Sequence, residues 1–497
     1  MAEAASLPVQ PHPSPASAGW RLEHSYAQLP ALFHVAVAPT PVRAPRLVVL
    51  NRSLAASLGL NAEALAGEDG AQIFSGNRLP PGAMPLAQAY AGHQYGHFTT
   101  LGDGRAILLG EQISPRGERF DIQFKGPGPT PYSRRGDGRG ALGPMLREYI
   151  ISEAMHALGI LTTRSLAVAA TGEEVWRQTK LPGAVLTRVA ASHIRVGTFE
   201  WAAAKGDQTA LRALVDYAVR RHFPGLADDE NPARALLETV IERQATLIAR
   251  WMLVGFIHGV MNTDNMAISG ETIDYGPCAF MDAYDPATAF SSIDAHGRYA
   301  YGNQPRIAQW NLARFAEALL PLLHAEEERA IAMATETVGA FTSRFQHHWL
   351  AGMRRKLGLF TEEPEDPALI DTLLTWMQKT KADFTNTFAE LIQIASPGAV
   401  QGDDEFVRWH AQWLARLGRQ PHSSAKSETL RRAHNPAFIP RNHLVEAALA
   451  AAEQNDLGVM ERLLAVLAAP YDYGRDAPEY RLPAPADGTG YQTFCGT

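Results

Sequence analysis

Side chains that could bind a divalent metal ion and accept a proton lie close together in the middle of the chain. The segment His258-Gly-Val-Met-Asn-Thr-Asp264-Asn265 is followed, after a short stretch, by Asp274-Tyr-Gly. Carboxylate and carboxamide oxygens are ligands that Mg²⁺ and Mn²⁺ prefer, especially where phosphate oxygens complete the coordination. The same residue types also cap turns by bonding to their own backbone. This segment alone therefore leaves a metal site and an ordinary turn as alternatives.

Features upstream favour the metal site. The segment GDGRAILLGE precedes Lys125 at the end of an expected strand, and Glu148 follows in the middle of an expected helix. Protein kinases have the same order: a glycine-rich loop, a strand lysine, a helix glutamate, a catalytic loop H-R-D-x-x-x-x-N and then D-F-G. His258 and Asn265 match the ends of that catalytic loop, but Val260 stands where the kinase base is expected. The order predicts nucleotide phosphate chemistry without the usual kinase base.

Two alternating segments and a helix must position these groups. RAILLGEQI and RFDIQFKG are separated by the turn-rich SPRGE and predict a β-hairpin. The apolar residues of the second strand share one face, which places Lys125 on the opposite face. The segment LGPMLREYIISEAMHALG has helical spacing and ends at Gly159, so Glu148 lies in the middle of a helix.

Further strands and a series of helices complete the predicted architecture. RSLAVAATGEEVWR and GAVLTRVAAS predict two strands joined near Thr171 and Gly172, and MAISGETIDYG predicts a short hairpin. Residues 20–85 are expected to be irregular structure attached to a larger core. The apolar period is helical in TALRALVDYAVRRHF, RALLETVIERQATLIARWMLVGFIHG, 308–336, 338–357, 367–393 and 441–468. The pattern predicts an α+β fold, a β-rich part with one long helix followed by a larger helical part.

Composition excludes several classes of protein. The chain has 497 residues and a formal net charge of -7, too mildly acidic for a protein that works mainly on nucleic acid. Its most apolar long stretch, LIARWMLVGFIHGVM, is broken by Arg250 and His258 and is shorter than the roughly 20 residues that cross a bilayer. The N-terminus lacks the regions of a signal peptide. Two cysteines suit a reducing compartment. We therefore expect a cytoplasmic protein with no membrane or nucleic-acid partner.

Four strings resemble the signatures of one known family. YAGHQYGHF, GDGRAILLGE, DIQFKGPGPTPYSRRGDGRG and HGVMNTDNM are similar to motifs of the selenoprotein O family (SelO, called YdiU in bacteria). The resemblance extends from about residue 20 to the C-terminal CGT. It implies a bilobal protein-kinase-like fold, with a β-rich N-lobe and a larger, mostly helical C-lobe. It also implies transfer of AMP from ATP to Ser, Thr or Tyr hydroxyls of proteins, with release of pyrophosphate.

With this fold the chain divides into five segments. We expect a mobile tail at 1–20, an N-terminal extension packed on the core at 21–100, the kinase-like N-lobe at 101–205, the helical C-lobe with catalytic loop and metal site at 206–400, and a C-terminal helical extension with a cysteine-containing tail at 401–497. The family resemblance and the absence of a long heptad pattern predict a monomer.

The resemblance also implies roles for individual residues. Asp264 matches the family's proton acceptor, and Asn265 and Asp274 match its ligands for Mg²⁺, with Mn²⁺ as a substitute. Glu148 matches the carboxylate that orients the phosphate-binding lysine. The positions that match nucleotide-binding residues are Gly102, Gly104, Arg105, Lys125, Asp137, Gly138, Arg188 and Arg195. In this family ATP lies reversed relative to ordinary kinases, so that arginines around the γ-phosphate hold the leaving pyrophosphate.

Three other functions are compatible with these residues. An ordinary phosphotransferase is disfavoured by the missing Asp at position 260. A catalytically inactive nucleotide-binding scaffold is disfavoured by the presence of Lys125, Glu148, Asn265 and Asp274. Transfer of UMP from UTP with Mn²⁺ by the same fold is left open by the sequence.

Two more groups of residues have patterns that can carry chemistry. His93 and His97 have the H-x-x-x-H spacing of a metal pair on a helix, but no Glu follows His93 and no third ligand is evident, so structural histidines are favoured. The basic stretch 354–356 is expected to be a solvated helix face.

The cysteines give a separate hypothesis. Cys278 follows Asp274 closely, and Cys495 lies near the C-terminus, where some family members carry selenocysteine. We consider a reversible disulfide between Cys278 and Cys495 that gates access to the site. The alternative is a buried Cys278 and a free, exposed Cys495.

Overall fold

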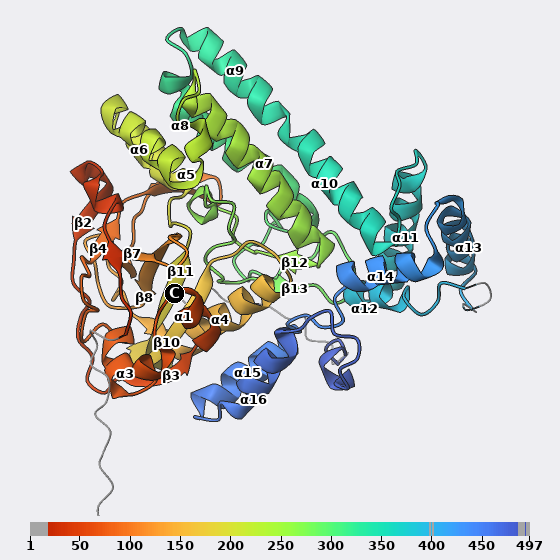
Figure 1. Ribbon diagram of the computed structural model, residues 1–497, viewed down its shortest axis with the longest axis horizontal. Coiled ribbons are helices and arrows are strands. Elements are labelled where there is room, and N and C mark those ends of the chain that lie inside the picture. The colour runs from red at the N-terminus through yellow and green to blue at the C-terminus, as the bar shows by residue number, and fades with distance from the viewer. Residues whose placement is uncertain (1–17, 397–398, 400–401, 486–492, 494–497) are drawn as a thin grey trace, which may run out of the picture.

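The computed structural model describes residues 18–396, 399, 402–485 and 493. Its first half is built on a large antiparallel sheet with the order β2-β4-β7-β8-β11-β10-β3, in which β1 also pairs with β7 and β9 with β11 (Figure 1). Two small sheets pair β5 with β6 and β12 with β13. The strands are β1 Leu22–Glu23, β2 His34–Ala36, β3 Arg46–Leu50, β4 Leu86–Gln88, β5 Ala91–Gln94, β6 His97–Thr100, β7 Ala106–Ile113, β8 Arg119–Lys125, β9 Gly140–Ala141, β10 Arg164–Trp176, β11 Lys180–Ala190, β12 Phe256–Ile257 and β13 Ala279–Phe280.

The predicted hairpin at the centre of the sheet is confirmed. β7 and β8 pair antiparallel, with Ala106 opposite Lys125. Ile122 and Phe124 are buried in a core on one face of the sheet, which is formed with the short helices α1 (Arg52–Ser57), α2 (Ala62–Leu65) and α3 (Glu68–Phe74). Gln123 and Lys125 point to the other face, yet they are also buried. A buried ammonium is costly without a charged partner, so the position of Lys125 demands carboxylates nearby.

Helix α4 covers the second face of the sheet and confirms the predicted helix around Glu148. It runs over Leu142–Ala157 and is followed by Gly159 at φ 76°, a conformation in which glycine ends helices. Its apolar residues share one core with Val168 of β10 and Leu186 of β11. The helix therefore holds Glu148 against the sheet rather than in solvent.

Residues 20–85 are more regular than expected. They supply β1, β2 and β3 to the large sheet, and β4 follows directly at Leu86. The expectation of irregular structure is wrong here because strands of two to five residues are too short to show alternation in the sequence.

The turn expected at Thr171 and Gly172 is also wrong. Both residues lie inside β10, at a shift in the pairing register, and the chain reverses at residues 177–179. Gly172 has φ 71°, and a Cβ there would lie 2.6 Å from the Cβ of Ala44. The glycine marks an irregularity and a close contact in the strand rather than a chain reversal.

The hairpin expected in MAISGETIDYG does not form. Ala267 pairs instead with Arg195, and Thr272 pairs with Thr162. The two ends of the segment thus find partners in other elements, which ties the loop that carries Asp264 to the β-rich half of the molecule.

Helices make up most of the second half, as predicted (Figure 1). Helices α7, α8, α9 and α10 pack in contact with one another, while α15 and α16 return to pack on α4. α13 and α14 lie outside the stretches with a helical apolar period but within the C-terminal helical extension expected at 401–497. The remaining helices are α1 Arg52–Ser57, α2 Ala62–Leu65, α3 Glu68–Phe74, α5 Val196–Ala204, α6 Gln208–His222, α7 Pro232–Leu253, α8 Gln304–Leu323, α9 Glu327–Gly339, α10 Phe341–Lys356, α11 Asp366–Thr380, α12 Phe384–Glu390, α13 Asp404–Arg419, α14 Ser424–His434, α15 Asn442–Glu453 and α16 Gly458–Leu467.

The basic stretch at the end of α10 is not a solvated face. Arg355 is exposed, but Arg354 forms an ion pair with Asp366, and Lys356 is buried with its Nζ 4.2 Å from the centre of the Phe388 ring. The expectation is wrong because α11 and α12 cover the end of this helix, which a single-helix pattern cannot show.

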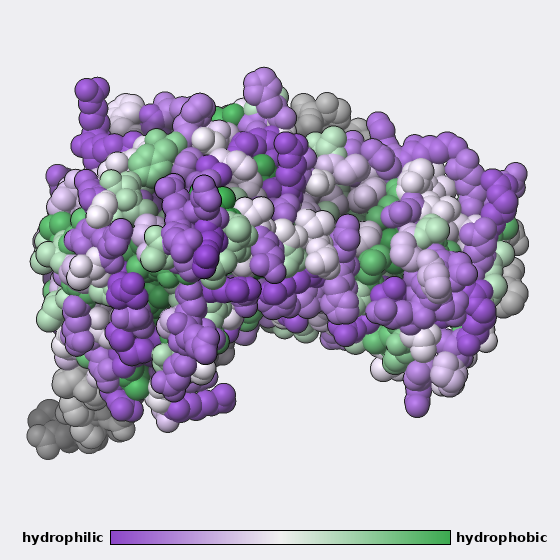
Figure 2. Space-filling view, turned by 90° about the horizontal axis from the view of Figure 1, so that it is seen from above, coloured by the Kyte–Doolittle hydropathy of each residue, from purple (hydrophilic) through white to green (hydrophobic). Residues whose placement is uncertain are grey.

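The surface is mostly polar on the face that Figure 2 shows. Hydrophilic residues predominate there, and apolar residues form separate patches between them. Among the helices of the described residues, none combines the length and the apolar character needed to span a membrane.

Candidate active site

Four charged side chains from distant parts of the sequence form one buried cluster. Lys125 Nζ donates to Glu148 Oε2 and to Asp274 Oδ1, each at 2.7 Å. Arg188 of β11 donates to Glu148 through Nε and through Nη2, the latter at 2.9 Å, and to Asp274 Oδ1 at 2.5 Å. The spacing of Lys125 and Glu148 was predicted from the sequence, whereas the bridging of both carboxylates by Arg188 arises from strand pairing.

The cluster keeps both carboxylates ionised. Burial alone would raise the pKa of Asp274, but Lys125 and Arg188 outweigh it and hold that pKa well below its ordinary value. Burial likewise acts to raise the pKa of Glu148, and Arg188 and Lys125 lower it overall. Two cations and two anions thus share a space from which water is largely excluded, and each charge depends on the others.

Asp274 is held in an unusual backbone conformation. Its φ is 66°, a left-handed value that residues other than glycine seldom adopt and that is often found at functional sites. The His258 side chain contributes to this placement, because its Nε2 lies 2.9 Å from the carbonyl oxygen of the preceding Ile273. The predicted loop histidine therefore acts on the position of the Asp274 segment.

Asp264 lies in a short helical turn, Thr263–Asn265, and has a free oxygen. Its backbone carbonyl accepts a hydrogen bond from Arg195 Nη1 at 2.8 Å, whereas its Oδ1 is buried without a hydrogen-bond partner among the described residues. Burial raises the pKa of Asp264 to about 7. A carboxylate that is buried, unpartnered and easily protonated is suited to accepting a proton.

Asn265 also presents a free oxygen. Its Nδ2 donates to the carbonyl of Val260 at 3.0 Å, which fixes the amide orientation, and its Oδ1 is buried without a partner in the described part of the chain. Together with the ionised Asp274, this oxygen fits a hard cation such as Mg²⁺. No cluster of three or more His, Cys, Asp or Glu residues suited to a metal exists in the described residues. Mg²⁺ usually takes few protein ligands alongside phosphate oxygens and water.

The predicted glycine loop is packed against a second loop. Gly102 has φ 123°, and a Cβ there would lie 2.4 Å from the Tyr132 ring. Thr130 Oγ1 donates to the carbonyl oxygen of Asp103 at 2.7 Å, and the Ser133 hydroxyl donates to the carbonyl of Gly104. The glycines therefore allow two loops to meet closely at the edge of the site.

A pocket of about 680 Å³ connects these loops with Asp264 and Asp274. Lys125 and Arg188 lie behind it, in contact with Asp274, and Glu148 pairs with both of these cations. Asp137 lies at its exposed side and forms an ion pair with Arg177, at 2.9 Å. The predicted site residues that line the pocket are Gly102, Gly104, Arg105, Asp137, Gly138, Asp264 and Asp274.

Two acidic residues of the site were missed by sequence reasoning. Asp103, between the two loop glycines, is buried; its Oδ1 lies 3.9 Å from Arg195 Nη2, and burial raises its pKa to about 6. Glu200 of α5 accepts from the Thr263 hydroxyl at 2.5 Å and lies 2.5 Å from His93 Nδ1. Asp103 could have been noticed because it lies in the GDG motif. Nothing in the sequence around Glu200 indicated its contacts with Thr263 and His93.

The two histidines of the YAGHQYGHF motif lie on a hairpin, β5–β6, rather than on a helix. His93 has the structural role that the sequence favoured, since its ring contacts Glu200 and its backbone N–H donates to Thr263 Oγ1 at 2.7 Å. His97 is exposed and pairs with Gln94, whereas His93 pairs with Phe98, so the two histidine side chains point to opposite faces of the hairpin. The pair therefore does not converge on a metal.

Cys278 is buried and has no disulfide partner in the described part of the chain, and burial raises the pKa of its thiol to about 12. Cys495 lies outside the described residues, so the hypothetical disulfide stays a prediction. Thr493, two residues before Cys495, is among the described residues. Its Oγ1 donates to the carbonyl of Pro277, which directly precedes Cys278, at 2.8 Å.

Comparisons with known proteins match almost the whole chain. A family model described as "Protein adenylyltransferase SelO" matches residues 19–468. A protein nucleotidyltransferase YdiU of Alkaliphilus metalliredigens is 60% identical over 481 residues, which cover 96% of this chain and 98% of the relative. Those of Halalkalibacterium halodurans and Geobacillus kaustophilus are each 62% identical over 483 residues, with 96% and 97% of this chain and 98% and 100% of the relative covered.

Proposed function

The chain belongs to the SelO family of protein adenylyltransferases, and we propose that it transfers AMP from ATP to Ser, Thr or Tyr hydroxyls of other proteins, releasing pyrophosphate. It is a protein nucleotidyltransferase, as its family and relatives are named. We further propose that its β-rich half and its helical half correspond to the two lobes of a protein-kinase-like fold. The nucleotide would then bind between them, in the pocket beside Asp274.

The buried cluster of Lys125, Glu148, Arg188 and Asp274 is the observation that carries this proposal. It places two cations side by side at the inner end of a nucleotide-sized pocket. Two neighbouring cations can neutralise a terminal phosphate and hold a leaving pyrophosphate, which a lone strand lysine does less well. This supports a nucleotide whose γ-phosphate lies at the inner end and whose α-phosphate lies nearer Asp264.

In the proposed reaction the acceptor oxygen attacks the α-phosphorus. A new bond forms between that oxygen and the α-phosphorus, and the bond from the α-phosphorus to the bridging oxygen of the leaving pyrophosphate breaks. Asp264 accepts the hydroxyl proton through its unpartnered Oδ1. Lys125, Arg188 and Arg195 stabilise the charge that develops on the departing pyrophosphate, in an environment where water screens it little.

Asn265 Oδ1 and the Asp274 carboxylate would hold the metal ion. Bound Mg²⁺ would withdraw charge from the phosphoryl oxygens. Asp274 is suited to this role because its pKa lies well below its ordinary value, so that it stays ionised. Glu148 positions Lys125 and Arg188 rather than touching the nucleotide, because both of its oxygens already accept hydrogen bonds from them.

The position of the label in ATP tests the reaction. We expect label from α-labelled ATP to become bound to protein in the presence of Mg²⁺, and label from γ-labelled ATP to be released. Lys125→Ala and Asp274→Ala should abolish this transfer, because one removes a phosphate-binding cation and the other a metal ligand. Lys379→Ala is a matched control, since Lys379 is an exposed lysine of α11 paired with Glu405.

The same assay distinguishes the other functions. Incorporation from γ-labelled ATP alone would identify an ordinary phosphotransferase, and incorporation of neither label from ATP or UTP would identify a nucleotide-binding scaffold. More efficient incorporation from α-labelled UTP with Mn²⁺ than from ATP with Mg²⁺ would identify a uridylyltransferase. Each of these results contradicts AMP transfer as the main activity.

A further inference from the structure

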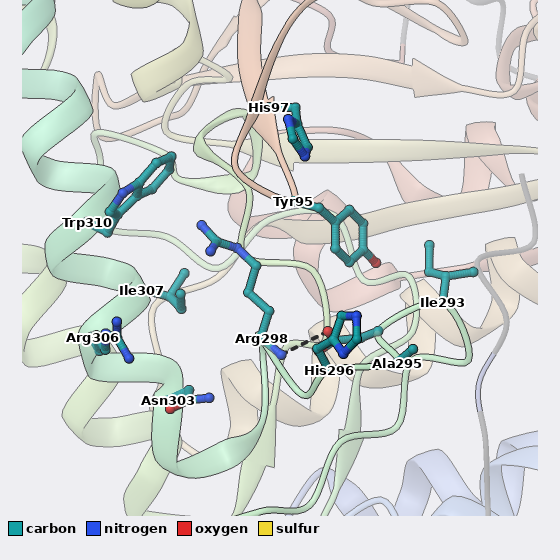
Figure 3. A pocket seen from close by; sticks show the side chains of 11 residues that line it. Tyr95, His97, Ile293, Ala295, His296, Arg298, Asn303, Arg306, Ile307 and Trp310 are labelled. Atoms are coloured by element: carbon teal, nitrogen blue, oxygen red, sulfur yellow. Dashed lines mark hydrogen bonds between the residues drawn. The ribbon is translucent and has the colours of Figure 1, made fainter.

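A second pocket, of about 680 Å³, is lined by residues that do not line the nucleotide pocket, including Tyr95 and His97 of the β5–β6 hairpin (Figure 3). Its walls come from three places: the turn between β5 and β6, the segment that follows β13, and the beginning of α8. Figure 3 shows Arg298 crossing the pocket between Tyr95 and Trp310, with His97 and Arg306 at its sides. None of these side chains has a role in the nucleotide chemistry proposed above.

Among the ionisable side chains of this pocket, those that attract anions outnumber the carboxylates. His97, His296, Arg298 and Arg306 line it, and the imidazoles can donate a hydrogen bond in either protonation state. The carboxylate that lines it, Asp294, is already occupied.

Backbone donors hold that carboxylate. Its Oδ1 accepts from the backbone N–H of Arg298 at 2.9 Å, and its Oδ2 accepts from the backbone N–H of Tyr299 at 2.8 Å. Within the described residues neither Arg298 nor Arg306 forms an ion pair with a carboxylate. The two guanidinium groups are therefore available to an acidic ligand.

Aromatic packing presents one of these cations in a defined position. The Arg298 guanidinium lies 5.0 Å from the centre of the Trp310 ring and 5.6 Å from that of Tyr299. Its Nε is buried without a hydrogen-bond partner in the described residues. Arg306, by contrast, is exposed in the first turn of α8, whose N-terminal end adds positive potential. A half-buried guanidinium and an exposed one therefore line the same pocket.

One amide joins this pocket to the catalytic loop. Asn262 Oδ1 accepts from the backbone N–H of Tyr95 at 3.1 Å and from the Tyr299 hydroxyl at 2.6 Å. Asn262 precedes Asp264 by two residues, which at about 3.3 to 3.6 Å per residue span no more than ~7 Å. The pocket thus begins close to the group proposed to accept the hydroxyl proton.

We propose that this pocket binds an Asp or Glu side chain of the acceptor protein and so selects segments with an acidic residue near the modified hydroxyl. The inference rests on the proposed transfer to protein hydroxyls, and it adds the chemistry of the acceptor. Because the pocket begins within ~7 Å of Asp264, about two residues of extended chain at ~3.3 Å each reach its edge. The acidic residue is therefore expected at least about two positions from the acceptor residue.

Peptide selection tests this inference. The wild-type protein is incubated with α-labelled ATP, Mg²⁺ and peptides that carry one central Ser, Thr or Tyr between randomised positions. We expect labelled peptides to be enriched in Asp or Glu at the stated distance. Arg306→Glu should remove this enrichment and raise the KM for an acidic peptide about tenfold, with the KM for ATP unchanged. Arg212→Glu is the matched control, because Arg212 is exposed on α6 away from both pockets.

The outcomes separate the inference from the proposed function. Labelling of peptides without acidic enrichment overturns the inference and leaves AMP transfer intact. An acidic preference that persists in Arg306→Glu at the level of Arg212→Glu also overturns it. If no peptide is labelled, transfer to peptide hydroxyls fails and the inference fails with it. A preference for Lys or Arg gained by Arg306→Glu would support direct contact between position 306 and the acceptor.

Discussion

Two lysine–glutamate ion pairs have the same N–O distance but differ in burial. Comparing them measures the effect of burial on the cluster around Lys125. Lys125 Nζ and Glu148 Oε2 lie 2.7 Å apart, with side-chain exposures of 6% and 1%. Lys379 Nζ and Glu405 Oε1 also lie 2.7 Å apart, but their side chains are 64% and 46% exposed. The same three variants are made for each pair: Glu→Gln alone, Lys→Met alone, and both substitutions together.

The expected magnitudes differ strongly. At 2.7 Å the attraction between unit charges is about 1.5 kcal/mol in bulk water and about 6 kcal/mol at an effective dielectric constant of 20. For the exposed pair, side-chain entropy and screening leave at most about 1 kcal/mol. Glu148→Gln leaves Lys125 and Arg188 with Asp274 as the carboxylate they share, and loss of one partner in a buried cluster costs roughly 3 to 5 kcal/mol.

The assay is guanidinium-induced unfolding of the metal-free protein, followed by far-UV circular dichroism. Glu148→Gln should lower the free energy of unfolding by several kcal/mol, and Glu405→Gln by less than about 1 kcal/mol. Lys125→Met should cost less in the Glu148→Gln background than in the wild type, because it then removes an unmatched cation. Equal costs for Glu148→Gln and Glu405→Gln, or additive effects of the two buried changes, would refute the argument that the cluster is held together by mutual charge compensation.

Three further predictions concern other residues. Asp264→Asn should lower the rate of AMP transfer roughly 100- to 10,000-fold with little change in the Kd for ATP, measured by calorimetry, because it removes the proton acceptor; a change in Kd alone would contradict that role. Burial lowers the pKa of Lys356 to about 7 from 10.5, so its charged form destabilises the fold on the order of 5 kcal/mol at low pH, and this cost falls as the pH rises from about 7 to 10.5. Lys356→Met should therefore raise the Tm at pH 6 much more than at pH 10, and a gain independent of pH would contradict the assignment. If Cys278 and Cys495 form a disulfide, oxidised wild type and Cys495→Ser should differ in mobility on a non-reducing gel; Thr493, two residues before Cys495, contacts the carbonyl that precedes Cys278, and identical mobility would reject the pair.

Local patterns in the sequence identified much of the scaffold. The alternation in RFDIQFKG was enough to place Lys125 opposite the apolar face, and the periodicity of residues 142–157 was enough to place Glu148 on a helix. Short strands were missed because a two- or three-residue strand has no measurable period. The role of Gly172 was misassigned because a positive φ serves a turn and an irregular strand equally well.

Long-range contacts were beyond the reach of such patterns. Arg188 meets Glu148 and Asp274 only because β11 pairs with β8 and α4 packs behind them. Glu200 supports the catalytic loop across a distance in sequence that no local motif records. The orientation of a side chain on one element is fixed by its own period, but its partner depends on how that element packs.

The sequence by itself thus determined which residue types are present for phosphate and metal chemistry, their order along the chain, and the strand or helix that carries Lys125 and Glu148. Only the tertiary structure decided that Arg188 joins them, that Asp264 and Asn265 each keep an oxygen without a partner among the described residues, and that a second pocket, lined by two arginines, lies near the Asp264 loop. The reason is physical. Propensity and periodicity act over a few neighbouring residues, whereas burial, charge compensation and unsatisfied hydrogen bonds depend on what distant segments bring to the same place.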